Sequence, residues 1–217
     1  MIKNLAEYVD TNPDMDLIKS LFDQVNVDNH NSFGKTQWIS YSLEDRATGE
    51  DKYIETFKPL LDQHRKVHPH IKRRDTGFNF SDDVKKDLYA HADIDFHLEH
   101  PNYYNLVIPV FGRSVIEYFE TNRDEIFLPE KDVHGHWYYW EFKNRTAMNK
   151  EDYENFLQEK KIGEIEVFDK PILLDTNTMH RVIVTESPRC AWVTRWNNIP
   201  ADVDFQTFKA KVQEILA

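Results

Sequence analysis

The second half of the chain is a succession of short runs rich in β-branched and aromatic residues, and this pattern restricts the possible fold more than any other feature. Runs of this length and composition, separated by polar residues or by Pro and Asn turns, are typical of strands. A series of short strands favours an antiparallel barrel or jelly roll. The runs are Leu88–Leu98, Tyr103–Phe111, Val115–Glu120, His136–Phe142, Ile162–Phe168, Ile172–Asp175, Met179–Val184 and Cys190–Trp196.

Helical patterns flank and interrupt these runs. Apolar residues recur at helical spacing at Leu17–Val25 and Ile54–Leu61, before the runs, and on one face of Asp204–Leu216, after them. We therefore expect a mainly β fold with α, in which helices from both ends of the chain buttress a β core. The expected organisation is one domain over 1–217, with a helical N-terminal part at 1–77, the β core at 78–199, a helical insertion at 149–160 and a C-terminal helix at 200–217.

The charge balance argues against a nucleic-acid partner. The 217 residues include 27 Lys and Arg against 38 Asp and Glu, for a net charge of −11. Nucleic-acid binders draw most of their affinity from basic groups that neutralise phosphates. One segment, His64–Arg74, is locally basic, and we interpret it as a solvated face rather than an anion-binding surface.

Several other classes of protein are excluded by what the sequence lacks. A single cysteine, Cys190, rules out an intramolecular disulfide and a Cys-rich zinc module, so any metal site must use His and carboxylate ligands. No apolar run approaches the roughly 20 residues of a membrane span, and Met1–Asp10 has no signal-peptide core. We expect a soluble cytoplasmic protein without a membrane partner.

The densest group of potential metal ligands lies between residues 91 and 100. Because side chains alternate across a strand, the odd-numbered residues of this segment share one face and the apolar even-numbered residues from 92 to 98 share the other. A polar face in water would explain the alternation, yet this face holds only imidazole and carboxylate, which suit Fe(II), Mn(II) or Zn(II). Its members are His91, Asp93, Asp95, His97 and Glu99.

A third ligand must come from elsewhere in the chain, and His180 is the best candidate. Arg189 begins the last run, and Arg195, six residues on, has the same facing. A guanidinium inside a barrel is costly unless an anion pairs with it, so an internal arginine implies a carboxylate or phosphate. We favour pairing with a neighbouring Asp or Glu for Arg195, and a dissociable anion for Arg189.

This combination of a His-x-Asp, a distal His and an Arg nine residues later resembles the iron(II) and 2-oxoglutarate-dependent oxygenases. The likeness spans Leu88–Trp196, and it is strongest for the aspartyl/asparaginyl hydroxylase-like members. It implies a double-stranded β-helix, also called a jelly roll or cupin-like core. The segments that carry it are Asn105–Val110, Gly163–Asp175, Met179–Ile183 and Pro188–Arg189.

The resemblance also assigns roles to residues. It implies that His91, Asp93 and His180 hold Fe(II) and that Arg189 pairs with the distal carboxylate of 2-oxoglutarate. The activity implied is hydroxylation of an amino acid, a peptide side chain or another small substrate. The pair of His97 and Glu99 is the alternative for the first two ligands, because its distance to Asn105 fits the short-loop members.

Two other functions stay open at this point. The first is a cupin-like metalloenzyme that uses no 2-oxoglutarate, and the second is a metal-free jelly-roll binding module. His100, His134 and His136 are interpreted as surface or substrate-side residues. Cys190 is interpreted as a small buried residue rather than a nucleophile.

Overall fold

The structure is a computed structural model that describes residues 4–24, 39–42, 54–71, 76–81, 90–93, 102–127 and 139–217. Within these residues, ten strands form one antiparallel sheet in the order β1-β9-β5-β10-β4-β7-β6, with β2 joined to β3, β3 to β10 and β8 to β5. The strands are β1 (Ala6–Tyr8), β2 (Ile39–Ser42), β3 (Gly77–Ser81), β4 (His91–Asp93), β5 (Asn102–Phe119), β6 (Ile126–Phe127), β7 (Tyr139–Phe142), β8 (Lys161–Val167), β9 (Ile172–Asp175) and β10 (His180–Ile199).

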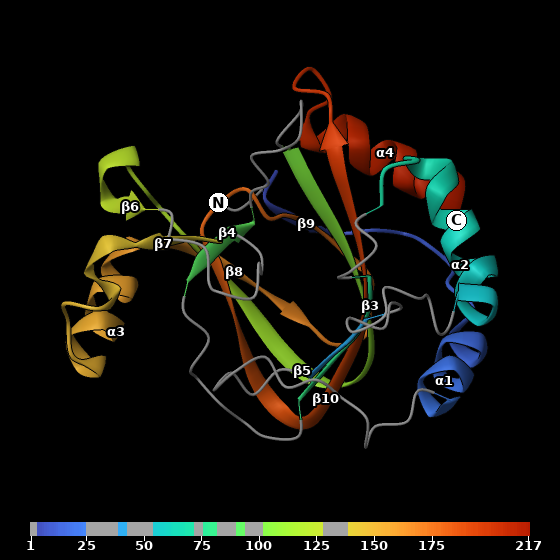
Figure 1. Cartoon of the computed structure of the whole chain (residues 1–217), viewed down its shortest axis with the longest axis horizontal. Coiled ribbons are helices and arrows are strands. Elements are labelled where there is room, and N and C mark those ends of the chain that lie inside the picture. Colours follow the sequence, from blue (N-terminus) through green and yellow to red (C-terminus); the bar gives the residue numbers. More distant parts are fainter. Residues whose placement is uncertain are drawn as a thin grey trace.

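The sheet is built around β5 and β10, which pair antiparallel along most of their length and curl together (Figure 1). The sequence pattern predicts two strands in each of these stretches, whereas the structure has one continuous strand in each. Between the predicted strands Met179–Val184 and Cys190–Trp196, β10 bends without ending, and its register shifts on both sides of Glu186. Such bulges bend a strand without ending its pairing.

Gly112 of β5 makes this bend possible. Its φ is +70°, and a Cβ placed on it would lie 2.3 Å from the carbonyl oxygen of Pro188 and 2.7 Å from Cα of Arg189. Only glycine adopts this conformation at low cost and leaves room for so close a backbone. The two long strands therefore cross the bend in contact with each other.

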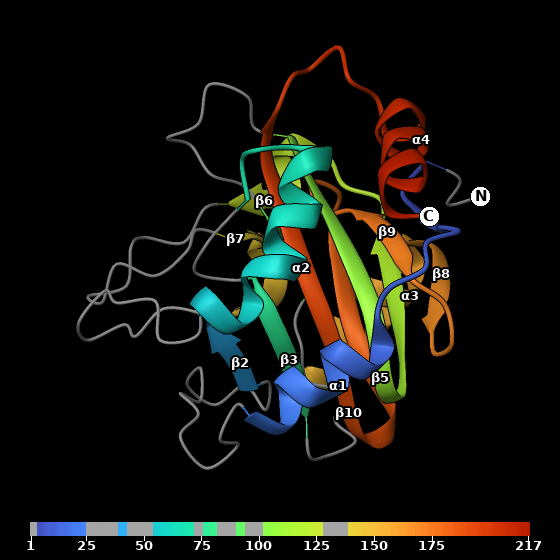
Figure 2. The same cartoon turned by 90° about the vertical axis from the view of Figure 1, so that its right-hand side faces the viewer.

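Three helices cover one face of the sheet: α1 (Met15–Gln24), α2 (Ile54–Val67) and α4 (Phe205–Leu216) (Figure 2). The main core lies between them and β3, β5 and β10, and Trp192 and Trp196 are its largest buried side chains. Alternation turns Ala191 and Val193 to the opposite, inner face, where they pack with residues of β1, β5, β8 and β9.

The mainly β fold buttressed by helices is confirmed, and the curl of the antiparallel sheet is consistent with a jelly roll. The insertion forms α3 (Lys150–Lys160), which lies at the end of the sheet that holds β6 and β7 (Figure 1). No helix among the described residues is long and apolar enough to cross a membrane.

The solvated face expected at His64–Arg74 is wrong at its first residue. The His64 side chain is buried in α2, with Nδ1 2.5 Å from Oγ1 of Thr194. Trp192 Nε1 donates to the same hydroxyl oxygen at 2.9 Å, and Trp196 Nε1 donates to the carbonyl oxygen of His64 at 3.0 Å. Burial lowers the pKa of His64 to about 4, so its neutral ring joins α2 to β10.

Candidate metal centre

Two of the predicted ligands face each other across neighbouring strands. β4 runs antiparallel to the start of β10 with His91 opposite His180, and the centroids of the two rings are 4.6 Å apart. Asp93 lies two residues beyond His91 on the same strand, with its Oδ1 3.9 Å from Nε2 of His91. The structure therefore brings together the three residues that the sequence favours as ligands.

The ring of His180 is held in one orientation. It is buried, and its Nδ1 is 2.9 Å from the carbonyl oxygen of Thr178. A carbonyl only accepts, so Nδ1 carries the proton and Nε2 keeps the lone pair. Burial, and to a smaller extent the nearby His91, lowers the pKa of His180 to about 4. The ring is neutral at pH 7, which is the form that binds metals.

Asp93 is buried, and hydrogen bonds from both its backbone and its side chain help to fix it. Its backbone N–H donates to the carbonyl oxygen of Thr176 at 2.8 Å, and its Oδ2 accepts from Nδ2 of Asn105 at 3.4 Å. Asn105 is itself buried, and its Oδ1 has no hydrogen-bond partner among the described residues. Asn105 thus orients Asp93. The sequence pattern does not predict this role, because it marks Asn105 only as part of a strand.

Tyr118 forms a wall of the same region. Its ring centroid lies 6.0 Å from that of His180, and its hydroxyl donates to the carbonyl oxygen of Leu5 at 2.9 Å. Complete burial raises the pKa of Tyr118 well above its usual value. The phenol is therefore neutral and packs beside the imidazole. An aromatic residue within a β run gives no sign of this role in the sequence.

Arg189 begins the second half of β10, opposite Ser81 of β3. It is buried, its Nη1 donates to the carbonyl oxygen of Asn79 at 3.5 Å, and burial lowers its pKa to about 10. The next residue, Cys190, packs in the helix-covered core, which confirms that it is a buried residue; burial raises its pKa to about 12. Alternation therefore places Arg189 on the inner face.

Arg195 follows on the inner face of β10, opposite Asn105 of β5. Its positive charge adds a minor contribution to the lowered pKa of His180, after burial and His91. Two arginines and His180 thus share the inner face of one strand. The structure separates their positions: Arg195 is opposite the residue that orients Asp93, and Arg189 is at the bend.

Within the described ranges, no group of three or more His, Cys, Asp or Glu side chains has the arrangement needed to hold a metal ion. His91, Asp93 and His180 lie together without closing such a group, and their role as ligands stays a prediction. His97 and Glu99, the alternative pair, lie outside the described residues, as do His100, His134 and His136.

Comparison with known proteins shows likeness in structure only. No protein-family model matches the sequence, and no curated protein matches it. HygX from Streptomyces hygroscopicus, solved with nickel and 2-oxoglutarate bound, is 13% identical over 90% of this chain and 84% of its own, with a TM-score of 0.49. E. coli ycfD is 13% identical over 76% of this chain, with a TM-score of 0.37. The chain spans 34% of the length of ycfD.

Proposed function

We propose that this protein is an Fe(II)- and 2-oxoglutarate-dependent oxygenase that hydroxylates an amino acid, a peptide side chain or another small substrate. The observation that carries the proposal is the cross-strand pair of His91 and His180, with Asp93 beside it. Two imidazoles and one carboxylate are the donor set of the facial triad of non-haem iron oxygenases. The donor types fit the metal, although the described side chains do not close a three-ligand group.

The residues of the chain would divide the work as follows. Bound iron and 2-oxoglutarate supply the oxidising chemistry, and the protein supplies orientation and exclusion of water. Thr178 fixes the tautomer of His180, and Asn105 orients the Asp93 carboxylate. Such outer contacts normally set the orientation and basicity of metal ligands. The burial of His180, Asp93 and Asn105 keeps water away from them.

Arg189 is the proposed partner of the distal carboxylate of 2-oxoglutarate. It is a buried cation on the inner face of the strand that begins with His180. The planar fork of guanidinium donors matches a carboxylate, and an anion offsets the cost of burying the charge. Arg195 is the second candidate, since it lies on the same face, opposite the Asn105 that donates to Asp93.

A second candidate function is a metal-free jelly-roll binding module. The observation in its favour is that the described residues form no closed group of three ligands. A third candidate is a cupin-like metalloenzyme that uses no 2-oxoglutarate. It needs the metal ligands but no arginine that binds a keto acid.

Anaerobic titration distinguishes the three functions. The purified protein is titrated with Fe(II) and then with 2-oxoglutarate, and the weak visible absorption of the iron-chelated keto acid is followed. The proposed function predicts this band in the wild type and its loss in His180→Ala and Arg189→Ala. Metal binding without the band would support the cupin-like enzyme. Absence of metal binding would contradict both enzymes and support the binding module.

A further inference from the structure

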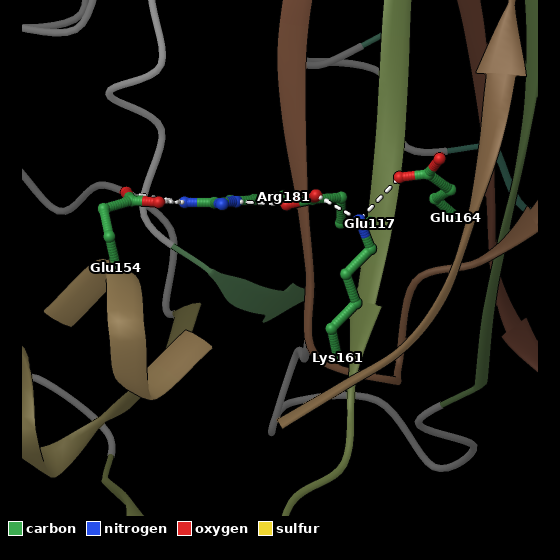
Figure 3. Close-up of polar contacts among 5 residues, drawn as sticks. All are labelled: Glu117, Glu154, Lys161, Glu164 and Arg181. Carbon is green, nitrogen blue, oxygen red and sulfur yellow. Dashed lines mark hydrogen bonds and ion pairs between the residues drawn. The ribbon is translucent and has the colours of Figure 1, made fainter. Parts of the chain in front are cut away.

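A network of charged side chains joins α3 to the sheet strands β5, β8 and β10 (Figure 3). Arg181, which follows His180, sends its guanidinium away from the inner face. Its Nε donates to Oε2 of Glu117 at 2.6 Å, and its Nη1 donates to both carboxylate oxygens of Glu154 at 2.8 and 2.9 Å. The Arg181 side chain is only 3% exposed, so α3 is joined to β10 by an ion pair at a buried guanidinium.

The rest of the network centres on Lys161, which directly follows α3 and whose backbone N–H donates to the carbonyl oxygen of Gln158. Lys161 of β8 donates to Oε1 of Glu117 and to Oε2 of Glu164, each at 2.6 Å. Glu164 is 55% exposed. Glu154 and Glu164 are therefore two glutamates of one network: Glu154 lies on α3 and pairs directly with Arg181 of β10, whereas Glu164 lies on β8 and pairs with Lys161.

The apolar side of α3 packs behind the other two predicted ligands. Leu157, with the partly buried Tyr153 and Phe156, belongs to a cluster that contains Ala90 and Ala92. Ala92 lies between His91 and Asp93 in β4, and alternation turns it to the opposite face. The Phe156 ring also stacks edge-on against Phe142 of β7, 5.0 Å between centroids. One helix therefore contacts the back of both strands of the candidate centre.

β4 pairs with two neighbouring strands in the described part of the chain. Its described residues are His91–Asp93, and among them His91 pairs with His180 of β10. Its other neighbour is β7, which it pairs through three residues. The backbone N–H of Asp93 bonds to Thr176, which follows β9. Among the described residues, one strand pair thus sets where His91 and Asp93 lie relative to His180, and any further contact that joins the two strands adds to it.

We infer that α3 fixes the relative position of the two ligand-bearing strands, and that Glu154 is the positioning residue that connects this helix to Arg181. The effect on metal binding rests on the proposed function, whereas the effect on the position of β4 does not. Charge-assisted hydrogen bonds of this kind are among the stronger hydrogen bonds of a protein. Loss of the Glu154 charge is therefore expected to loosen β4 while the long β5–β10 pair stays intact.

Hydrogen exchange of the metal-free protein tests the inference directly. In Glu154→Gln, the amide of Asp93 should exchange about tenfold faster than in the wild type, because β4 opens more often. The amides of Leu106 and Val107, within the β5–β10 pair, should exchange at the wild-type rate. Glu164→Gln is the matched control and should change neither. Equal exchange at Asp93 in Glu154→Gln and the wild type would overturn the inference.

A second variant tests the role of α3 without changing the charge of Glu154. Phe156→Leu weakens the apolar contact of α3 and keeps the Glu154 ion pair, and it should likewise speed exchange at Asp93 only. Faster exchange at Leu106 and Val107 in both variants would show general destabilisation and would also overturn the inference.

Co(II) binding then connects the inference to the candidate centre. Glu154→Gln should bind Co(II) about tenfold more weakly than the wild type, at the lower end of the range for outer contacts of metal ligands, and Glu164→Gln should bind normally. Failure of the wild type to bind Co(II) would contradict the proposed function alone, since the exchange measurement would still decide the role of α3. Normal Co(II) affinity in Glu154→Gln, with binding in the wild type, would contradict the positioning role.

Discussion

His91 and His180 stand directly opposite each other on antiparallel strands, with their ring centroids 4.6 Å apart. Burial keeps His180 neutral, and its Nδ1–H is directed to the carbonyl oxygen of Thr178. An imidazole in this state presents Nε2 as a lone-pair donor. The pair is therefore the part of the structure most directly suited to a divalent metal.

Removal of one imidazole should abolish tight metal binding. His91→Ala is expected to lose stoichiometric Co(II) binding by equilibrium dialysis at pH 7.5, since one of two neighbouring nitrogen donors is gone. The control is His70→Ala, because His70 is exposed and lies after α2. Undiminished binding in His91→Ala would exclude His91 as a ligand and would direct attention to His97 and Glu99.

The two arginines should differ in their effect on 2-oxoglutarate. Arg189→Gln removes the buried charge and is expected to weaken 2-oxoglutarate binding by at least about tenfold, since a charge-assisted contact is worth about 1.5–3 kcal/mol. Co(II) affinity without the keto acid should stay at the wild-type value. Isothermal titration with 2-oxoglutarate in the presence of Co(II) measures the affinity of Arg189→Gln and of Arg195→Gln for the keto acid. The reverse pattern, with loss in Arg195→Gln and retention in Arg189→Gln, would assign the keto acid to Arg195.

Gly112→Ala should destabilise the protein severely. A non-glycine residue in the left-handed region costs about 1–2 kcal/mol, and here the added Cβ would also lie 2.3 Å from the Pro188 carbonyl oxygen. Because the obstacle is backbone, relief requires a shift of the bend itself. We expect urea unfolding to show a free energy of unfolding about 3 kcal/mol or more below that of the wild type. Unfolding at the wild-type urea concentration would show that the bend adapts without cost.

The sequence pattern locates single strands well and joins between strands poorly. β9 begins and ends where its apolar run does, at Ile172 and Asp175. The sequence pattern predicts separate strands on either side of Gly112 and of Pro188, because the apolar pattern stops at each bend. In the structure the backbone pairing continues across the bulges, and no residue pattern reports that continuity.

In the candidate site, too, the sequence predicts the local features and not those that depend on distant residues. Period-two alternation is a local property, so it suffices to place His91 and Asp93 on one face of a strand. The orienting role of Asn105 depends on which strand lies beside which, and that is set by the whole sheet. The burial of His64 depends on Thr194, far away in the chain, so a local reading of the basic run assigned it to solvent.

His64 should make the stability of the fold depend on pH. Its pKa is lowered from 6.5 to about 4 in the folded state by burial, so below pH 6.5 the unfolded chain takes up a proton that the folded chain refuses. The contribution of the neutral ring is complete above pH 6.5 and is lost as the pH falls towards 4. The linkage relation gives a loss of about 2 kcal/mol between pH 7 and pH 5. His64→Gln keeps a polar group near Thr194 but does not titrate, and His180 titrates alike in both proteins, so the difference isolates His64. Urea unfolding at the two pH values should therefore show a steeper loss in the wild type, and parallel losses would contradict the buried neutral ring.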